Sequence, residues 1–194
     1  MVNNKEMLKS QNRPVCYRDF MVLVQRRNAF IEEFVRECKA IGVNVTGVDK
    51  LKLLEQIAVQ DLLSLAKFLL LPQDDLSLAE VLKSPLFSLT DDDLFDLCYN
   101  RKNVSLWSKL KANQKYENIA EQLNNLLQKA DYIRPFELFG YILNALNGRK
   151  KFVARLGTEA EDALDEFINL TLSFENNHIP DLQTFINDKT VYAK

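Results

Sequence analysis

From Leu51 to its end, the chain repeats apolar residues at steps of three and four, the period of an α-helix that buries one face. The most regular stretch, residues 158–176, sets carboxylates opposite its apolar side chains. Helices are predicted over residues 58–71, 77–83, 105–111, 116–130, 135–146, 151–156, 158–176 and 182–186, with a short helical or turn segment at 52–57 and another helix after Thr90. The chain is therefore predicted to be mainly α.

The first 50 residues show a different pattern. Residues 1–16 are polar and aperiodic, which is typical of a linker or a disordered segment. A mostly apolar run at Asp19–Val24 and an alternating one at Val43–Val48 predict two strands, and a helix between them ends at Gly42. Two strands do not support a sheet alone. The predicted fold class is a helical domain with a short α/β lead-in (strand–helix–strand) from an incomplete domain.

Hydroxyl and acidic residues mark predicted helix starts. Thr90 before three aspartates is the clearest, since a capping hydroxyl and acidic groups both favour the positive end of a helix. Two further pairs have the spacing of a capping box: Ser77 with Glu80, and Thr158 with Glu161. The acidic turns at 73–75 and 91–93 are candidate metal sites, but capping already accounts for them, so no metal site is predicted.

Composition excludes several classes of protein. Of 194 residues, 47% are hydrophobic and 27% charged, which excludes a disordered chain. The net charge of −2 gives no overall attraction to nucleic acid. The three cysteines are scattered without CxxC spacing, which argues against a disulfide framework or zinc site and favours a reducing, cytoplasmic setting. No apolar run approaches 18 residues, so a soluble protein without a membrane partner is predicted.

Catalytic motifs are missing from the sequence. It contains no GxxxxGK[ST] phosphate loop, no GxGxxG and no HExxH. The single histidine, His178, lies in a loop-like segment and is predicted to be an ordinary solvated side chain, while Cys38 and Cys98 fall on apolar helix faces as structural thiols. Without a nucleophile–base pair, an unrecognised hydrolase is disfavoured and no catalytic residue is predicted.

Basic residues offer two alternatives. Arg149, Lys150, Lys151 and Arg155 form a compact positive cluster just after a predicted helix end. Such a cluster can contact phosphates. Alternatively, it can interact favourably with the dipole at a helix C-terminus and increase solubility. A looser set comprises Arg101, Lys102, Lys109, Lys111 and Lys115. The only tryptophan, Trp107, has the helical spacing of a core residue rather than of a base-stacking platform.

Two N-terminal segments resemble a known family. DFMVLVQRRNA, from residue 19, resembles the strand-plus-arginine segment that opens the second motor domain of UvrD/RecB-type superfamily 1 DNA helicases, with Arg26 and Asn28 on its arginine and asparagine. The segment from residue 47 is similar to the next family motif, where Glu55 and Asp61 align with its first glutamate and its aspartate. Ala58 replaces another glutamate of that motif.

The later helices resemble one branch of this family. LSLAEVLKSPLFSLTDDDLFDL, RPFELFGYIL, ARLGTEAEDALDEFINLTLSFE and DLQTFI look like parts of the AddA-type subunit of the bacterial helicase–nuclease that repairs double-strand breaks. The match covers about residue 15 to residue 187. After the polar linker at 1–16, it implies part of a RecA-like 2A domain at 17–72 and a helical 2B-like domain at 73–194.

The resemblance also implies a function. The nucleotide-binding motifs are expected before residue 1 and after residue 194, so ATP and magnesium are assigned to the parent protein and no cofactor to this chain. The expected role is that of a non-catalytic middle portion, an excised fragment or a gene remnant, that guides duplex DNA or regulates unwinding. The alternative is a helical scaffold that docks a protein without touching DNA.

The resemblance implies two kinds of partner. DNA, duplex or single-stranded, is reached through the parent protein, and a second, AddB-like subunit completes the helicase–nuclease. The candidate DNA-binding residues are Arg26, Arg27, Arg149, Lys150, Lys151 and Arg155.

Overall fold

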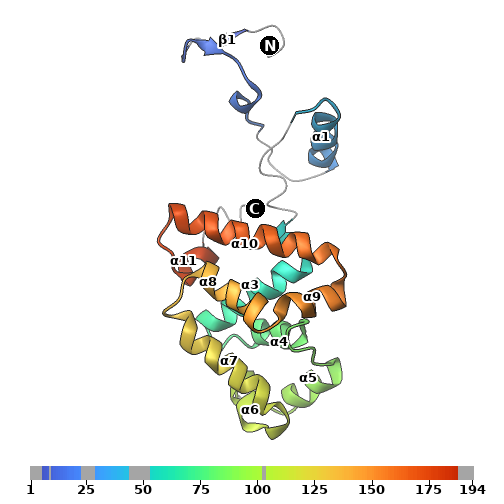
Figure 1. The fold of residues 1–194 in the computed structure, drawn as a ribbon. Helices are drawn as coiled ribbons and strands as arrows, with labels where there is room; N and C mark the ends of the chain where they lie inside the picture. The colour runs from blue at the N-terminus through green and yellow to red at the C-terminus, as the bar shows by residue number, and fades with distance from the viewer. Residues whose placement is uncertain (1–5, 9, 23–28, 44–52, 102–103, 188–194) are drawn as a thin grey trace. The chain divides into compact units, whose positions relative to one another are not determined.

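A computed structural model describes residues 6–8, 10–22, 29–43, 53–101 and 104–187 (Figure 1). The chain divides into two compact units, Met1–Asp49 and Lys50–Lys194. The family-based boundary between residues 72 and 73 remains a prediction.

The N-terminal unit contains a small antiparallel pair, β1 (Met7–Leu8) and β2 (Arg13–Pro14), in which Met7 faces Pro14. A 3-10 turn, η1 (Tyr17–Asp19), follows it, and α1 (Ala29–Ala40) comes later in the chain. The predicted end of this helix is confirmed, because Gly42 follows with φ at +74°, a conformation that glycine adopts without steric cost.

The predicted strand at Asp19–Val24 is wrong for the residues described. Asp19 is the last residue of η1. The next three residues are exposed, and they pair with no strand among the described residues. The cause is local: the Asp19 carboxylate accepts hydrogen bonds from the Arg13 guanidinium and, at 2.8 Å, from the Cys16 amide, which closes the chain into a turn. Residues 23–24 and most of the strand predicted at Val43–Val48 lie outside the described ranges.

The second unit is helical, which confirms the predicted mainly α fold class with a small strand content ahead of it (Figure 1). Its helices are α3 (Ile57–Leu70), α4 (Asp75–Lys83), α5 (Asp91–Cys98), α6 (Leu106–Ala112), the 3-10 turn η2 (Gln114–Tyr116), α7 (Glu117–Ala130), α8 (Pro135–Gly140), the π-helical η3 (Tyr141–Ala145), α9 (Gly148–Leu156), α10 (Glu159–Asn177) and α11 (Leu182–Asn187).

The helix α3 lies at the centre of the second unit. It is apolar on nearly every side, and a helix of that kind is stable only when other elements surround it. It packs against α4, α7, α10 and α11. Phe68 of α3 is fully buried and meets the ring of Trp107 edge-on, with ring centroids 5.5 Å apart. The prediction that Trp107 belongs to the core is confirmed.

A second group of aromatic rings joins α8, α10 and α11. Phe139 lies 4.8 Å from Phe167 and 5.9 Å from Phe185, centroid to centroid, and Phe174 lies 5.2 Å from Phe185. Most of these pairs meet edge to face, the arrangement that aromatic quadrupoles favour. The described part of the chain has no helix long and apolar enough to cross a membrane.

The acidic turns act as helix caps, as predicted. Asp74 accepts the amides of Leu76 and Ser77, both at 3.1 Å, at the start of α4. Thr90 and Asp93 form a reciprocal capping box at the start of α5, with distances of 3.2 and 3.1 Å. Among the described residues, no group of three or more His, Cys, Asp or Glu side chains is arranged to hold a metal ion.

The two other predicted capping boxes are wrong. The helix α4 begins two residues before Ser77, because the Asp74 carboxylate caps it and also accepts the Ser77 hydroxyl. Glu80 instead accepts a hydrogen bond from the Ser64 hydroxyl of α3. Thr158 precedes α10 as its N-cap residue, but its backbone is already helical and its side chain makes no capping bond.

Candidate nucleic-acid interface

The compact basic cluster lies on α9, which a tight backbone connection places against α4. Asn147 has φ at +57°, in the left-handed region, and ends the π-helical turn η3. Gly148 then starts α9 so close to η3 that a Cβ atom there would lie 2.7 Å from the Ile142 carbonyl oxygen. The sharp turn sets Arg149, Lys150 and Lys151 in the first turn of α9.

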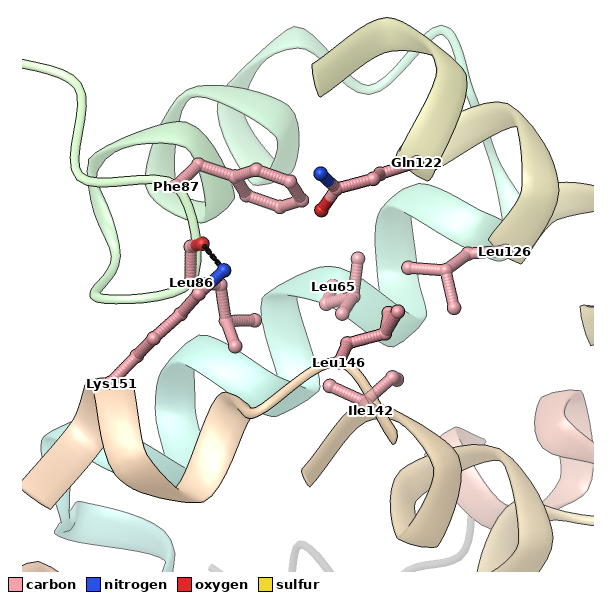
Figure 2. A pocket seen from close by; sticks show the side chains of 8 residues that line it. All are labelled: Leu65, Leu86, Phe87, Gln122, Leu126, Ile142, Leu146 and Lys151. Carbon is pink, nitrogen blue, oxygen red and sulfur yellow. Dashed lines mark hydrogen bonds between the residues drawn. The ribbon is translucent and has the colours of Figure 1, made fainter. Parts of the chain in front are cut away.

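Positive charges in the first turn of a helix interact unfavourably with its dipole. The dipole of α9 therefore does not account for Arg149, Lys150 and Lys151 at its start. Lys151, and Arg155 in the last turn of α9, instead serve the end of a different helix. The Lys151 ammonium donates to the Leu86 carbonyl at 2.7 Å, and the Arg155 guanidinium donates to the Lys83 carbonyl at 2.8 Å. Lys83 is the last residue of α4, and Leu86 lies in the loop after it (Figure 2). Arg155 therefore caps the C-terminal end of α4, and Lys151 holds the loop that follows it.

The remaining two cations are differently placed. Arg149 forms an ion pair with Asp165 of α10, which packs beside α9. Lys150 is exposed and makes no ion pair with any residue in the described ranges. Lys150, with Arg149 beside it, is therefore the most available part of the cluster for a phosphate. Arg26 and Arg27, like the family-motif position Asn28, lie outside the described residues.

A pocket beneath the cluster is too small for a ligand. Its wall is mainly apolar, with Leu65 and Leu126 on one side, Ile142 on another, and the Lys151–Leu86 bond at its edge (Figure 2). The cavity volume is about 10 Å³, room for about one water molecule. Recognition at this face must therefore use the surface charges.

The two remaining family-motif positions differ in environment. Glu55 is exposed, whereas Asp61 is half-buried on α3. Burial raises the pKa of Asp61 from its ordinary 3.8 to about 6; Arg155 opposes the rise and Glu80 adds to it. Arg155 thus serves two purposes, because it offsets the Asp61 charge and caps α4.

We expect Asp61→Asn to stabilise the chain above neutral pH. A carboxyl whose pKa is raised by folding stabilises the fold only while it is protonated, so its contribution falls between pH about 4 and pH about 6. Allowing for partial exposure, the gain at pH 8 should be about 1 kcal/mol, and it should vanish near pH 4. Denaturant unfolding at both pH values measures it. Glu55→Gln, which removes a carboxylate from an exposed site, is the matched control, and an equal gain there at pH 8 would contradict the role of burial.

Two aspartates join helices in a way that local spacing did not predict. Asp75 forms an ion pair with Arg101 and accepts the Leu106 amide at 2.7 Å, which fixes α6 to α4. Asp93 accepts from Lys115 at 2.6 Å and from the Tyr116 hydroxyl at 2.8 Å. Hydrogen bonds from Lys115, Thr90 and Tyr116 hold the pKa of Asp93 well below its ordinary range.

These ion pairs use two members of the looser basic set, Arg101 and Lys115. The predicted exposure of His178 is confirmed; its ring stacks on Phe174, with centroids 4.8 Å apart. Cys98 packs against the core as a half-buried thiol.

Curated proteins give the chain a family context. The A-type subunit of the ATP-dependent helicase/nuclease from Clostridioides difficile is 26% identical over 160 residues, which is 80% of this chain and 12% of that protein. Its counterpart in Thermoanaerobacter sp. is 25% identical over 185 residues, 90% of this chain and 15% of the relative. The counterpart in Heliobacterium modesticaldum is 35% identical over 82 residues, 42% of this chain and 6% of the relative. No family model matches the chain.

The predicted resemblance to AddA-type subunits is confirmed by these matches, of which the first two cover 80% and 90% of the chain. The chain spans only 12–15% of the length of the first two relatives.

Proposed function

We propose that this chain is a non-catalytic part of an AddA-type protein of a helicase–nuclease and contacts DNA through Lys150 and Arg149 of α9. The observation that carries this proposal is the 25–26% identity to helicase/nuclease subunits over 80–90% of the chain. ATP and magnesium would be bound by other parts of the parent protein, since the sequence has no phosphate loop and the pocket beneath α9 holds about one water molecule. A cytoplasmic site of action and a second, AddB-like subunit complete the proposal.

Charge makes the proposed contact local and weak. The unit Lys50–Lys194 has 17 Lys and Arg residues against 21 Asp and Glu residues, so it does not attract DNA as a whole. The first half of α10, beside α9, exposes Glu161, Asp162 and Asp165. We therefore expect non-specific binding to duplex DNA with a Kd of about 10⁻⁵ M near 0.1 M salt.

We expect Lys150→Ala to weaken that binding about threefold and to lower the salt slope of log K by about 1, because one phosphate contact is lost. Fluorescence anisotropy of the chain with a labelled duplex at several salt concentrations measures both. Thermal unfolding should not change, since the Lys150 side chain is exposed.

Lys67→Ala is the matched control, because it removes an exposed lysine from α3. An equal loss with Lys67→Ala would mean that only net charge matters. Titrations that stay flat for the unchanged chain would reject DNA contact and favour the second candidate function.

The second candidate function is a helical scaffold that docks another protein without touching DNA. The excess of carboxylates over cations in Lys50–Lys194 favours it, because protein partners tolerate an acidic surface that phosphate does not. In that case DNA titrations should stay flat for the unchanged chain and for both the Lys150 and the Lys67 variant.

A further inference from the structure

The helix α5 turns aromatic residues toward solvent. Asp92 and Asp96 are four residues apart, as are Phe95 and Tyr99, the C-cap residue of α5. Asp92 also lies three residues before Phe95, so the four side chains lie along one side of the helix. Phe95 is 62% exposed and Tyr99 is 68% exposed, whereas Leu97 on the other side is buried. We call these four residues the α5 stripe. Neither ring of the stripe belongs to the hydrophobic core, and α5 lies at an edge of the helical unit (Figure 1).

The two rings of the α5 stripe stack on each other at the surface, and we call this pair the aromatic platform. Phe95 and Tyr99 stack with centroids 5.3 Å apart and planes at 29°. A lone exposed apolar residue is ordinary on a protein surface. Two stacked rings at the surface instead leave their outer π faces accessible, and such faces attract cations and planar groups.

The charges beside the platform are negative, and within the described ranges two of them have no ion-pair partner. Of the three aspartates that begin α5, Asp91 pairs with Lys83 and Asp93 pairs with Lys115. Asp92 and Asp96, the two within the stripe, form no ion pair with any residue that the structure describes. Carboxylates in this position repel phosphate, so the stripe is unsuited to nucleic acid.

We propose that the α5 stripe docks an arginine-bearing amphipathic helix of a partner protein. A guanidinium group fits both features of the stripe, because it stacks flat on an aromatic ring and forms forked hydrogen bonds with a carboxylate. Arginines three or four residues apart on the partner would match the spacing of Asp92 and Asp96, and the apolar part of their side chains would cover the rings. This inference is independent of the DNA contact proposed for α9.

The test uses a labelled helical peptide of about 18 residues, built from alanine, leucine and arginine with the arginines on one face. Its affinity for the full chain is measured by fluorescence anisotropy at about 0.15 M salt. The double variant Phe95→Ser and Tyr99→Ser keeps every charge and should bind at least about tenfold more weakly. Asp92→Asn with Asp96→Asn should show a similar loss. A peptide with lysine in place of arginine should bind the unchanged chain less tightly, because lysine lacks the flat fork.

Glu161→Gln with Asp162→Asn removes two exposed carboxylates from α10 and is the matched control, which should bind like the unchanged chain. Circular dichroism checks that all variants fold. An equal loss with the α10 variant would overturn the proposal in favour of general charge attraction, and unchanged binding by the serine variant would overturn it outright. Two other results would also overturn it: a dimer in sedimentation that the serine variant disperses, which assigns the stripe to a second copy, or duplex DNA binding that this variant abolishes.

Discussion

Replacing Gly148 by alanine should lower the free energy of unfolding by about 3 kcal/mol. The added Cβ atom would lie 2.7 Å from the Ile142 carbonyl oxygen and 3.1 Å from a methyl group of Leu86. The first contact is with backbone, which can yield only if the π-helical turn η3 shifts. The second is with the loop that Lys151 holds to α9. Both relaxations disturb buried structure.

Thermal or denaturant unfolding measures this effect, and a chain of this size should lose roughly 6–12 °C in its melting temperature. Gly140→Ala is a close control, eight residues earlier in the same connected helices. Gly140 has helical backbone angles, and its Cβ would meet nothing within 4 Å. That change should be neutral or stabilise the chain by about 0.5 kcal/mol, since alanine favours helix. If both variants unfold alike, the close approach at Gly148 is not what constrains this turn.

Phe139→Ala should cost about 4 kcal/mol, the largest loss that we expect from a single side chain here. Phe139 is fully buried and contacts the rings of Phe167 and Phe185. Removing its ring leaves a cavity where α8, α10 and α11 meet, and the aromatic neighbours cannot collapse into it without losing their edge-to-face geometry. Guanidinium unfolding followed by circular dichroism gives the free energy.

Phe95→Ala removes the same ring from the surface of α5, where it is 62% exposed. Its effect should stay within about 0.5 kcal/mol. A loss below about 1 kcal/mol for Phe139→Ala would show that the aromatic group repacks easily and does not hold these three helices together.

Much of the helical unit was predictable because its signals are local. Leu62, Leu65 and Phe68 recur at the helical period and are all buried on α3. Thr90 with Asp93 formed the predicted capping box, because each partner lies within one turn of the other. Gly42 ended its helix for the same kind of reason.

Other local signals gave wrong predictions because, at each of two sites, two possible hydrogen-bonding or folding patterns competed. Ser77 had the spacing of a cap, yet Asp74, three residues earlier, took that role and shifted the start of α4. At Asp19 the apolar residues that follow suggested a strand, but the carboxylate was held by Arg13 and closed a turn. The spacing of apolar residues does not show which of two competing hydrogen bonds will form.

The candidate interface was predictable in position but not in role. The run Arg149-Lys150-Lys151 stands out in the sequence, yet the acceptors of Lys151 and Arg155 lie 65 and 72 residues earlier in the chain. The two hydrogen bonds that Asp75 accepts, from Arg101 and from the Leu106 amide, connect residues 26 and 31 positions apart. Partners at such distances are set by packing, so no spacing rule revealed that part of the cluster serves α4.

These long-range caps have a consequence for synthesis on the ribosome. When Lys83 and Leu86 leave the exit tunnel, the donors for their carbonyl groups have not yet been translated. Until Lys151 and Arg155 emerge, water must form the hydrogen bonds to those carbonyl groups. The last turn of α4 is less stable during that time. The nascent chain can therefore complete this corner only after α9 has emerged.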